Sequence, residues 1–164
     1  MIVTPALVIF LVLTFIPVFL FVRTIDKRKW LSLLVSVVLT PLIYFYMLYP
    51  FLNIIVPFHH EKYFNAEKWE KKPGLRYEMI SHIVNDSVFF GKTKTEVDNL
   101  IGTYEWLSWD DSLKQHDENK WNYGLGLLPG AFNEEKECAT FIFKNDTLVE
   151  IERYKEQIVY EDNE

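Results

Sequence analysis

An uncharged apolar stretch, Trp30 to Phe58, constrains this chain more than any other feature. Its 29 residues include no Asp, Glu, Lys, Arg or His. A single helix over them would be about 44 Å long, whereas the hydrocarbon core of a bilayer is about 30 Å thick. Part of the stretch must therefore tilt, bend or leave the bilayer. We predict a membrane span over residues 30–49 and an interfacial collar over residues 50–58.

A second apolar run, Ile2 to Val22, has 21 residues without a charge, which is enough to cross the hydrocarbon core. A cleaved signal peptide is the alternative. It would need a basic segment before the apolar run and a small-residue cleavage site after it. No Lys or Arg precedes this run, and Arg23-Thr24-Ile25 is not such a site. We therefore predict a retained span over residues 2–22 and a transmembrane helical hairpin over residues 1–58.

The loop between the two spans, residues 23–29, gives the orientation. It contains four basic residues in seven positions: Arg23, Lys27, Arg28 and Lys29. Short loops rich in Lys and Arg stay on the cytoplasmic side of a membrane. Both ends of the hairpin then lie on the opposite side. We predict a two-pass protein of the bacterial inner (cytoplasmic) membrane, with an extracytoplasmic C-terminal domain.

Charge divides the chain into two unlike parts and excludes several functions. Residues 1–58 carry four basic and one acidic side chains, whereas residues 59–164 carry 13 basic and 22 acidic ones. So acidic a domain lacks the basic face that nucleic acid requires. The predicted spans contain no charge, which argues against an ion path or a proton relay. Cys138 is the only cysteine, so neither an intramolecular disulfide nor a thiolate metal cluster can form.

The polar part of the chain is patterned as one small domain over residues 76–154. A linker, residues 59–75, precedes it and ends at the turn pair Pro73-Gly74. An acidic tail, residues 155–164, follows it. Apolar residues at helical spacing predict a first helix over Arg76 to Asn85.

A second helix follows Thr93, which forms a capping box with Glu96, and it ends at Gly102. Alternating residues then predict strands, joined by an acidic loop over residues 110–120 and by a turn at Asn145-Asp146. The predicted strands are residues 104–109, 121–125, 139–144 and 147–154. The fold class is therefore α+β, with two short helices packed on one face of a three- to four-stranded antiparallel sheet.

The segment Phe90 to Gly102, which reads FGKTKTEVDNLIG, resembles the "G-K/M-T-x-x-E-V-x-x-L-L-G" segment of small envelope domains of the BamE/SmpA type. Trp121, Tyr123, Leu125 and Gly126 resemble the W-x-Y-x-L-G strand of that family, and residues 141–146 resemble its last hairpin. The resemblance covers residues 76–154. It implies a fold similar to beta-lactamase-inhibitor proteins, whose members act as scaffolds or enzyme inhibitors. The matching positions are caps, turns and core residues, so the resemblance implies no site.

The leading functional hypothesis is a non-enzymatic interaction or scaffold module of the cell envelope, in contact with the lipid bilayer and with a protein partner at its surface. Exposed aromatic residues on the sheet would provide the partner surface. The candidates are Trp106, Trp109, Trp121 and Tyr123. The alternative is that these side chains belong to the core.

A subunit acting through its transmembrane hairpin is the second hypothesis. Ser32, Ser36 and Thr40 lie four residues apart, which is the spacing of a small-residue packing stripe. The alternative is that their hydroxyls bond to the helix that carries them.

The third hypothesis is an enzyme. Its candidate catalytic residues are His82, His116, the Asp110-Asp111 pair and Cys138. The acidic pair fits no EF-hand loop, and no serine lies in a nucleophile-elbow pattern. The pair His59-His60 would serve as a polar collar, because neighbours in sequence rarely point at one ion. We therefore predict no catalytic residue, no cofactor and no metal site.

Overall fold

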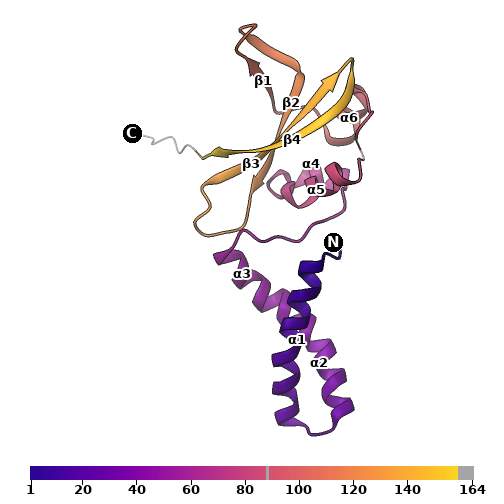
Figure 1. The fold of residues 1–164 in the computed structure, drawn as a ribbon, viewed down its shortest axis with the longest axis vertical. Coiled ribbons are helices and arrows are strands. Elements are labelled where there is room, and N and C mark those ends of the chain that lie inside the picture. The colour runs from indigo at the N-terminus through magenta and orange to yellow at the C-terminus, as the bar shows by residue number, and fades with distance from the viewer. Residues whose placement is uncertain (88, 159–164) are drawn as a thin grey trace. The chain divides into compact units, whose positions relative to one another are not determined.

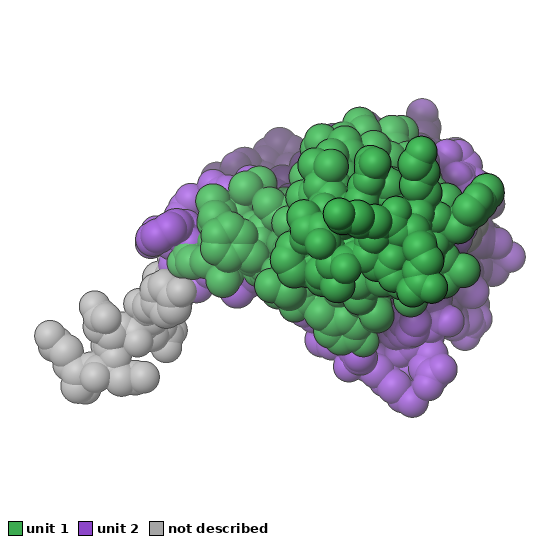
Figure 2. Space-filling view, turned by 90° about the horizontal axis from the view of Figure 1, so that it is seen from below, with its two compact units in different colours: residues 1–60, 129–131 green, residues 61–128, 132–164 purple. Residues whose placement is uncertain are grey.

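The computed structural model describes residues 1–87 and 89–158. The chain divides into two compact units (Figure 2). The first unit comprises residues 1–60 and 129–131, and the second comprises residues 61–128 and 132–164.

The first unit is a helical hairpin with an extended second arm (Figure 1). Its elements are α1 (Pro5–Ile25), α2 (Lys29–Ile43), the π-helix η1 (Tyr44–Leu48) and α3 (Tyr49–Ile55). Two helical stretches, of 21 and 27 residues, are long and apolar enough to span a membrane. The second stretch changes to π-helical bonding between Pro41 and Pro50, two residues that cannot donate the usual backbone hydrogen bond.

The second unit is an α+β domain (Figure 1). Its helices are α4 (Ala66–Lys71), the 3-10 helix η2 (Pro73–Leu75), α5 (Tyr77–Asn85) and α6 (Lys94–Ile101). Its strands are β1 (Trp106–Asp110), β2 (Gln115–Leu127), β3 (Glu135–Lys144) and β4 (Thr147–Gln157). Within the described residues these strands form one antiparallel sheet in the order β1-β2-β3-β4. The predicted fold class is confirmed at this level.

The core of the second unit lies between the helices and one face of the sheet. The helical layer contributes Trp69, Ile80, Ile83 and Val97, among others. Alternate residues of β2 and β3 fill the core from the sheet, because successive side chains of a strand point to opposite faces. From the sheet come Trp121, Tyr123, Leu125, Ala139, Phe141 and Phe143.

The local sequence signals hold in the structure. The Thr93 hydroxyl accepts a hydrogen bond from the Glu96 backbone, and the Glu96 carboxylate accepts one from the Thr93 backbone, so the predicted capping box starts α6. The β3–β4 turn places Asn145 at φ 51° and Asp146 at φ 65°. Asn and Asp tolerate this left-handed region better than other residues with side chains, which explains their use in a tight hairpin.

Three predicted boundaries require correction. The linker 59–75 contains α4 and η2, because Asn65 caps a helix that buries Trp69 completely in the core. The acidic loop 110–120 shrinks to a turn, since β2 begins at Gln115 and pairs with β1. The predicted acidic tail begins inside β4, and residues 159–164 lie outside the described residues.

Candidate functional site

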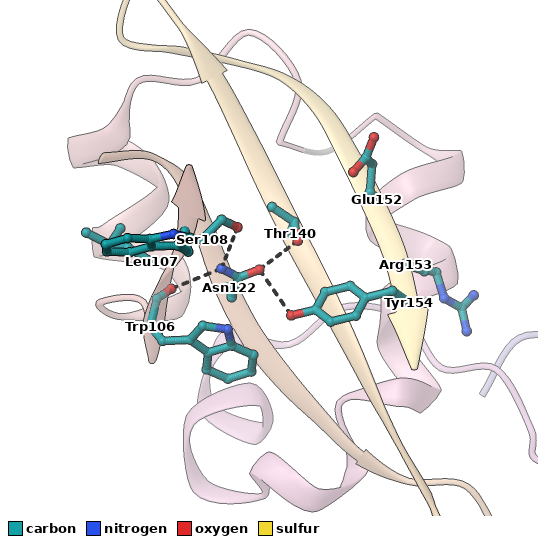
Figure 3. A pocket seen from close by; sticks show the side chains of 9 residues that line it. Trp106, Leu107, Ser108, Asn122, Thr140, Glu152, Arg153 and Tyr154 are labelled. Carbon is teal, nitrogen blue, oxygen red and sulfur yellow. Dashed lines mark hydrogen bonds between the residues drawn. The ribbon is translucent and has the colours of Figure 1, made fainter. Parts of the chain in front are cut away.

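A pocket of about 740 Å³ lies on the second unit's sheet (Figure 3). Its centre is Asn122, on the face opposite the helices, because the flanking Trp121 and Tyr123 point into the core. We call this hollow the sheet pocket. It is lined by Trp106, Leu107, Ser108, Trp109, Asn122, Thr140, Glu152, Arg153 and Tyr154. All four strands contribute to it, because the register places Asn122 opposite Trp106 on one side and Thr140 on the other, with Glu152 beyond Thr140.

The floor of the sheet pocket is a saturated hydrogen-bond network around Asn122, which is only 1% exposed. Its amide nitrogen donates to Ser108 Oγ at 2.9 Å and to the Trp106 carbonyl at 3.3 Å. Its amide oxygen accepts from Thr140 Oγ1 at 2.6 Å and from the Tyr154 hydroxyl at 3.2 Å (Figure 3). These four bonds use the full capacity of the amide. The network ties all four strands together and gives the floor a fixed shape.

Replacing Asn122 by alanine is expected to lower the free energy of unfolding by about 2–3 kcal/mol, because it removes two donors and two acceptors from a buried network. Asn119 is the matched control, since its exposed amide oxygen accepts a single bond, from Lys94 Nζ. The change Asn119→Ala should cost less than about 0.5 kcal/mol. Urea unfolding followed by tryptophan fluorescence measures both values. Equal effects of the two changes would contradict the structural role of the network.

The rim of the sheet pocket is aromatic and charged. Trp109 is 54% exposed, and its ring lies edge-on to the His116 ring at 5.2 Å. Trp106 is half-buried, with Lys136 Nζ at 4.8 Å from its ring centroid. Glu152 is exposed on β4, whereas the Arg153 guanidinium donates to Glu137 at 2.7 Å and points away from the pocket floor (Figure 3). The rim therefore combines an accessible indole with the carboxylate of Glu152.

The predicted partner surface needs correction, because its four residues do not share a face. Trp121 and Tyr123 are buried in the core. The Tyr123 hydroxyl donates to the Gly102 carbonyl at 2.9 Å, and the Trp121 indole donates to the Glu118 carbonyl at 3.0 Å. Trp106 and Trp109 remain at the sheet pocket.

Sequence reasoning missed Tyr154, which joins Trp106 and Trp109 at the pocket. Strand alternation could have identified it, because Glu150, Glu152 and Tyr154 are two residues apart along β4 and therefore point to the same face of the sheet. Burial raises the pKa of the Tyr154 hydroxyl above its usual range, so it remains a hydrogen-bond donor at neutral pH.

The structure brings two of the candidate enzymatic groups, His116 and Asp110, to one hollow, whereas His82 and Cys138 lie elsewhere. His82 accepts a hydrogen bond at Nδ1 from the Phe64 backbone, at 3.3 Å, and its Nε2 lies 3.1 Å from Asp86 Oδ2. His116 and Asp110 both line a polar hollow of about 410 Å³ at the β1–β2 turn. Hydrogen bonds from Ser112 and Leu113 hold the pKa of the Asp110 carboxyl below its usual value. This carboxylate therefore stabilises the turn.

Metal-ligating side chains do not gather in the part of the chain that the structure describes: it contains no group of three or more His, Cys, Asp or Glu that could hold an ion. Of the predicted collar pair, His60 is buried in the first unit. Its Nε2 lies 3.3 Å from the Tyr44 hydroxyl, and its ring stacks on Tyr49 at 4.3 Å. The surroundings of His60 are thus those of an aromatic cluster.

Cys138 is fully buried in β3, and burial raises the pKa of its thiol to about 11. Since the thiolate is the reactive form, the folded chain at pH 7.5 should react with maleimide at least 100-fold more slowly than the chain in urea. The raised pKa also makes the native state hold its proton more tightly than the unfolded state. This contribution to stability is complete below pH 9 and declines as the pH rises toward 11. Rapid labelling of the folded chain would contradict the burial of the thiol.

The small-residue stripe packs inside the helical hairpin. Ser32, Ser36 and Thr40 are buried, and in a pair of helices only the facing helix, α1, can cover them. The buried positions on α1 are Leu7, Thr14, Val18 and Val22. The Ser36 and Thr40 hydroxyls also donate to carbonyls one turn back, each at 2.7 Å. The stripe is therefore not free to pack against a second protein, because α1 already occupies it.

Comparison of the chain with protein-family models, with curated proteins and with solved structures found no match. The resemblance to BamE/SmpA envelope domains thus stays a prediction, and functional inference rests on the residues and geometry of this chain.

Proposed function

We propose that this chain is a non-enzymatic interaction module of the bacterial cell envelope. In this proposal the helical hairpin anchors it in the cytoplasmic membrane, the second unit lies on the extracytoplasmic side, and the sheet pocket binds a segment of a protein partner. Scaffolding, as in some of the envelope domains that residues 76–154 resemble, is the form of interaction that we propose.

The exposed apolar surface of the first unit supports the membrane anchor. Among the described residues, many apolar side chains of α1 and α2 are more than half exposed or close to it; examples are Ile16, Leu20, Leu34 and Val37. A core helix of a soluble protein would bury such side chains. Leaving apolar area in water costs about 25 cal/mol per Å², whereas the interior of a bilayer removes this cost.

The distribution of charge supports the orientation. The turn between α1 and α2 carries Lys27 and Arg28, and Arg23 and Lys29 lie in the adjoining helix ends. Asp26 is the one acidic residue there, and it already pairs with Arg28 at 2.9 Å. Under the positive-inside rule this end of the hairpin is cytoplasmic. A single crossing, by the stretch Lys29–Ile55, separates this turn from the second unit, so the second unit lies outside.

The sheet pocket is the single observation that carries the proposed binding function. Its floor needs no ligand to satisfy its polar groups, so it acts as a shaped platform rather than a reaction centre. Its rim offers Trp109, the kind of residue that dominates binding energy at protein interfaces, beside the exposed carboxylate of Glu152. The net charge of −9 over residues 59–164 favours a polypeptide over a nucleic acid.

Site-specific photo-crosslinking tests this function. A photoreactive amino acid replaces Trp109 in one variant and Val149, which is 49% exposed and lies outside the sheet pocket, in the control. Irradiation of whole cells should give a discrete crosslinked protein with the variant at position 109. The same product at position 149, or no product at either position, would count against the sheet pocket as the binding site.

A further inference from the structure

The connection between β2 and β3 exposes a large aromatic side chain. Phe132 is 91% exposed, the highest exposure among the large apolar residues of the described chain. The loop that carries it is well held. The Asn133 amide donates to the Leu128 carbonyl at 3.0 Å and to the Glu135 carbonyl at 3.2 Å, and its oxygen accepts from the Glu135 backbone at 3.2 Å. These bonds hold the backbone of the loop that carries Phe132.

The residues just before Phe132 belong to the first unit. Residues 129–131 cluster with the helical hairpin, and the Ala131 backbone N–H donates to the Ile54 carbonyl at 3.0 Å. Ile54 lies in α3, which continues the second apolar helix. Phe132 follows Ala131 directly in the chain, so the Cα atoms of these two residues are about 3.8 Å apart.

The length of the helix indicates the depth of this contact. Ile54 lies 25 residues after Lys29, the first residue of α2, and therefore about 38 Å along a helix. A hydrocarbon core is about 30 Å thick, and the bilayer with its headgroups about 40–45 Å. With the basic turn at one surface, Ile54 reaches the opposite headgroup layer. Phe51, Ile55 and Val56 are also exposed around it.

We propose that the β2–β3 loop is a second membrane contact, in which Phe132 inserts into the interfacial layer of the phospholipid bilayer. A bulky apolar side chain such as phenylalanine is stabilised at the boundary between headgroups and acyl chains, because its surface there leaves water. The contact would restrict the second unit to the membrane surface, so that its partners are proteins at that surface. This inference rests on the proposed membrane anchor.

Spin-label depth measurements on the full chain in phosphatidylcholine and phosphatidylglycerol vesicles test the inference. Three single substitutions carry the label: Phe132→Cys, Leu113→Cys and Val12→Cys. Leu113 is the matched control, because it is apolar and 65% exposed but lies in the β1–β2 turn. Val12 lies on the exposed side of α1 and reports the anchor itself. Cys138 stays in place, because it is fully buried, and the unsubstituted chain shows the background.

Accessibility to oxygen and to a water-soluble nickel chelate, present on both sides of the vesicles, gives the depth of each label. We expect oxygen to dominate at position 12 and, less strongly, at position 132, whereas nickel dominates at position 113. Nickel dominance at position 132 with oxygen dominance at position 12 would overturn the loop contact and leave the anchor intact. Nickel dominance at position 12 would overturn both. Low accessibility of position 132 to both reagents would indicate protein contact and also overturn the inference.

Discussion

The change Gly126→Ala is expected to lower the free energy of unfolding of the second unit by about 3–4 kcal/mol, from left-handed backbone strain together with overpacking. Gly126 has φ +101°, in a region that favours glycine, at an irregularity in the β2–β3 pairing. A Cβ at this position would lie 2.2 Å from the Gly74 carbonyl oxygen. The carbonyl oxygen is a backbone atom, and a Cβ is bonded directly to the backbone, so neither can rotate away. The 3-10 helix η2 would therefore have to move away from the sheet.

Two glycine controls separate the causes of this effect. Gly91 has φ +82° with open space around an added Cβ, so Gly91→Ala should cost about 1 kcal/mol, from backbone strain alone. Gly74→Ala changes the other side of the contact, yet its Cβ would meet nothing within 4 Å, and its expected cost is below about 1 kcal/mol. Urea unfolding in detergent micelles measures all three. A Gly126 variant no less stable than the Gly91 variant would show that η2 does not pack directly on β2.

The change Arg76→Met is expected to cost about 3–4 kcal/mol, because it leaves two carbonyls inside the fold without their charged donor and breaks an ion pair whose carboxylate partner is 38% exposed. The buried Arg76 guanidinium donates to the Trp69 carbonyl at 2.9 Å and to the Gly124 carbonyl at 3.1 Å, and it pairs with Glu105. It also lies 5.1 Å from the centroid of the Trp69 ring. One side chain thus joins α4, β2 and the segment before β1. Methionine retains the apolar stem and removes every one of these bonds.

Lysine should not rescue this position, because one ammonium group cannot reach three acceptors that a planar guanidinium serves together. Lys71→Met is the matched control. Lys71 pairs with Glu67 at 2.8 Å, but both side chains are exposed, so the expected loss is about 0.5 kcal/mol or less. Equal losses for Arg76→Met and Lys71→Met, measured in the same urea titration, would contradict the proposed role of Arg76.

The elements that the sequence predicted well depend on short-range chemistry. The capping box of α6 uses residues three positions apart, and the β3–β4 turn uses two adjacent residues that accept positive φ. The two apolar helices follow from composition and length alone. Information of this kind lies within a few turns of the chain, so no knowledge of the tertiary fold is needed to read it.

The packing of the second unit and the candidate site both depend on contacts between residues far apart in the chain. Arg76 meets Glu105 across 29 positions, and Asn122 meets Tyr154 across 32 positions. No local pattern reports such pairs. Trp69 looked like part of a linker because its helix is only six residues long, although tertiary packing buries its ring completely. The start of β2 lacked an alternating apolar pattern because most of its first residues are exposed, so pairing with β1 alone defines that strand.

The orientation of Trp121 and Tyr123 shows the limit of reasoning from one strand. Alternation predicts that both residues share a face, and they do. It does not say which face the helices cover. The helical layer covers the face with the large aromatic rings, because this buries more apolar surface. The opposite face keeps Asn122, Thr140 and Tyr154, which form the floor of the sheet pocket.

The central claim, an anchor in the membrane with an extracytoplasmic domain, is tested most directly by topology reporters fused after Glu164 in a bacterial host. Alkaline phosphatase is active only outside the cytoplasm, whereas green fluorescent protein is fluorescent only inside it. We expect an active phosphatase fusion and a dark fluorescent-protein fusion. Replacing Arg23, Lys27, Arg28 and Lys29 by glutamine should weaken this asymmetry, because it removes the orienting charge. A fluorescent fusion together with an inactive phosphatase would contradict the account.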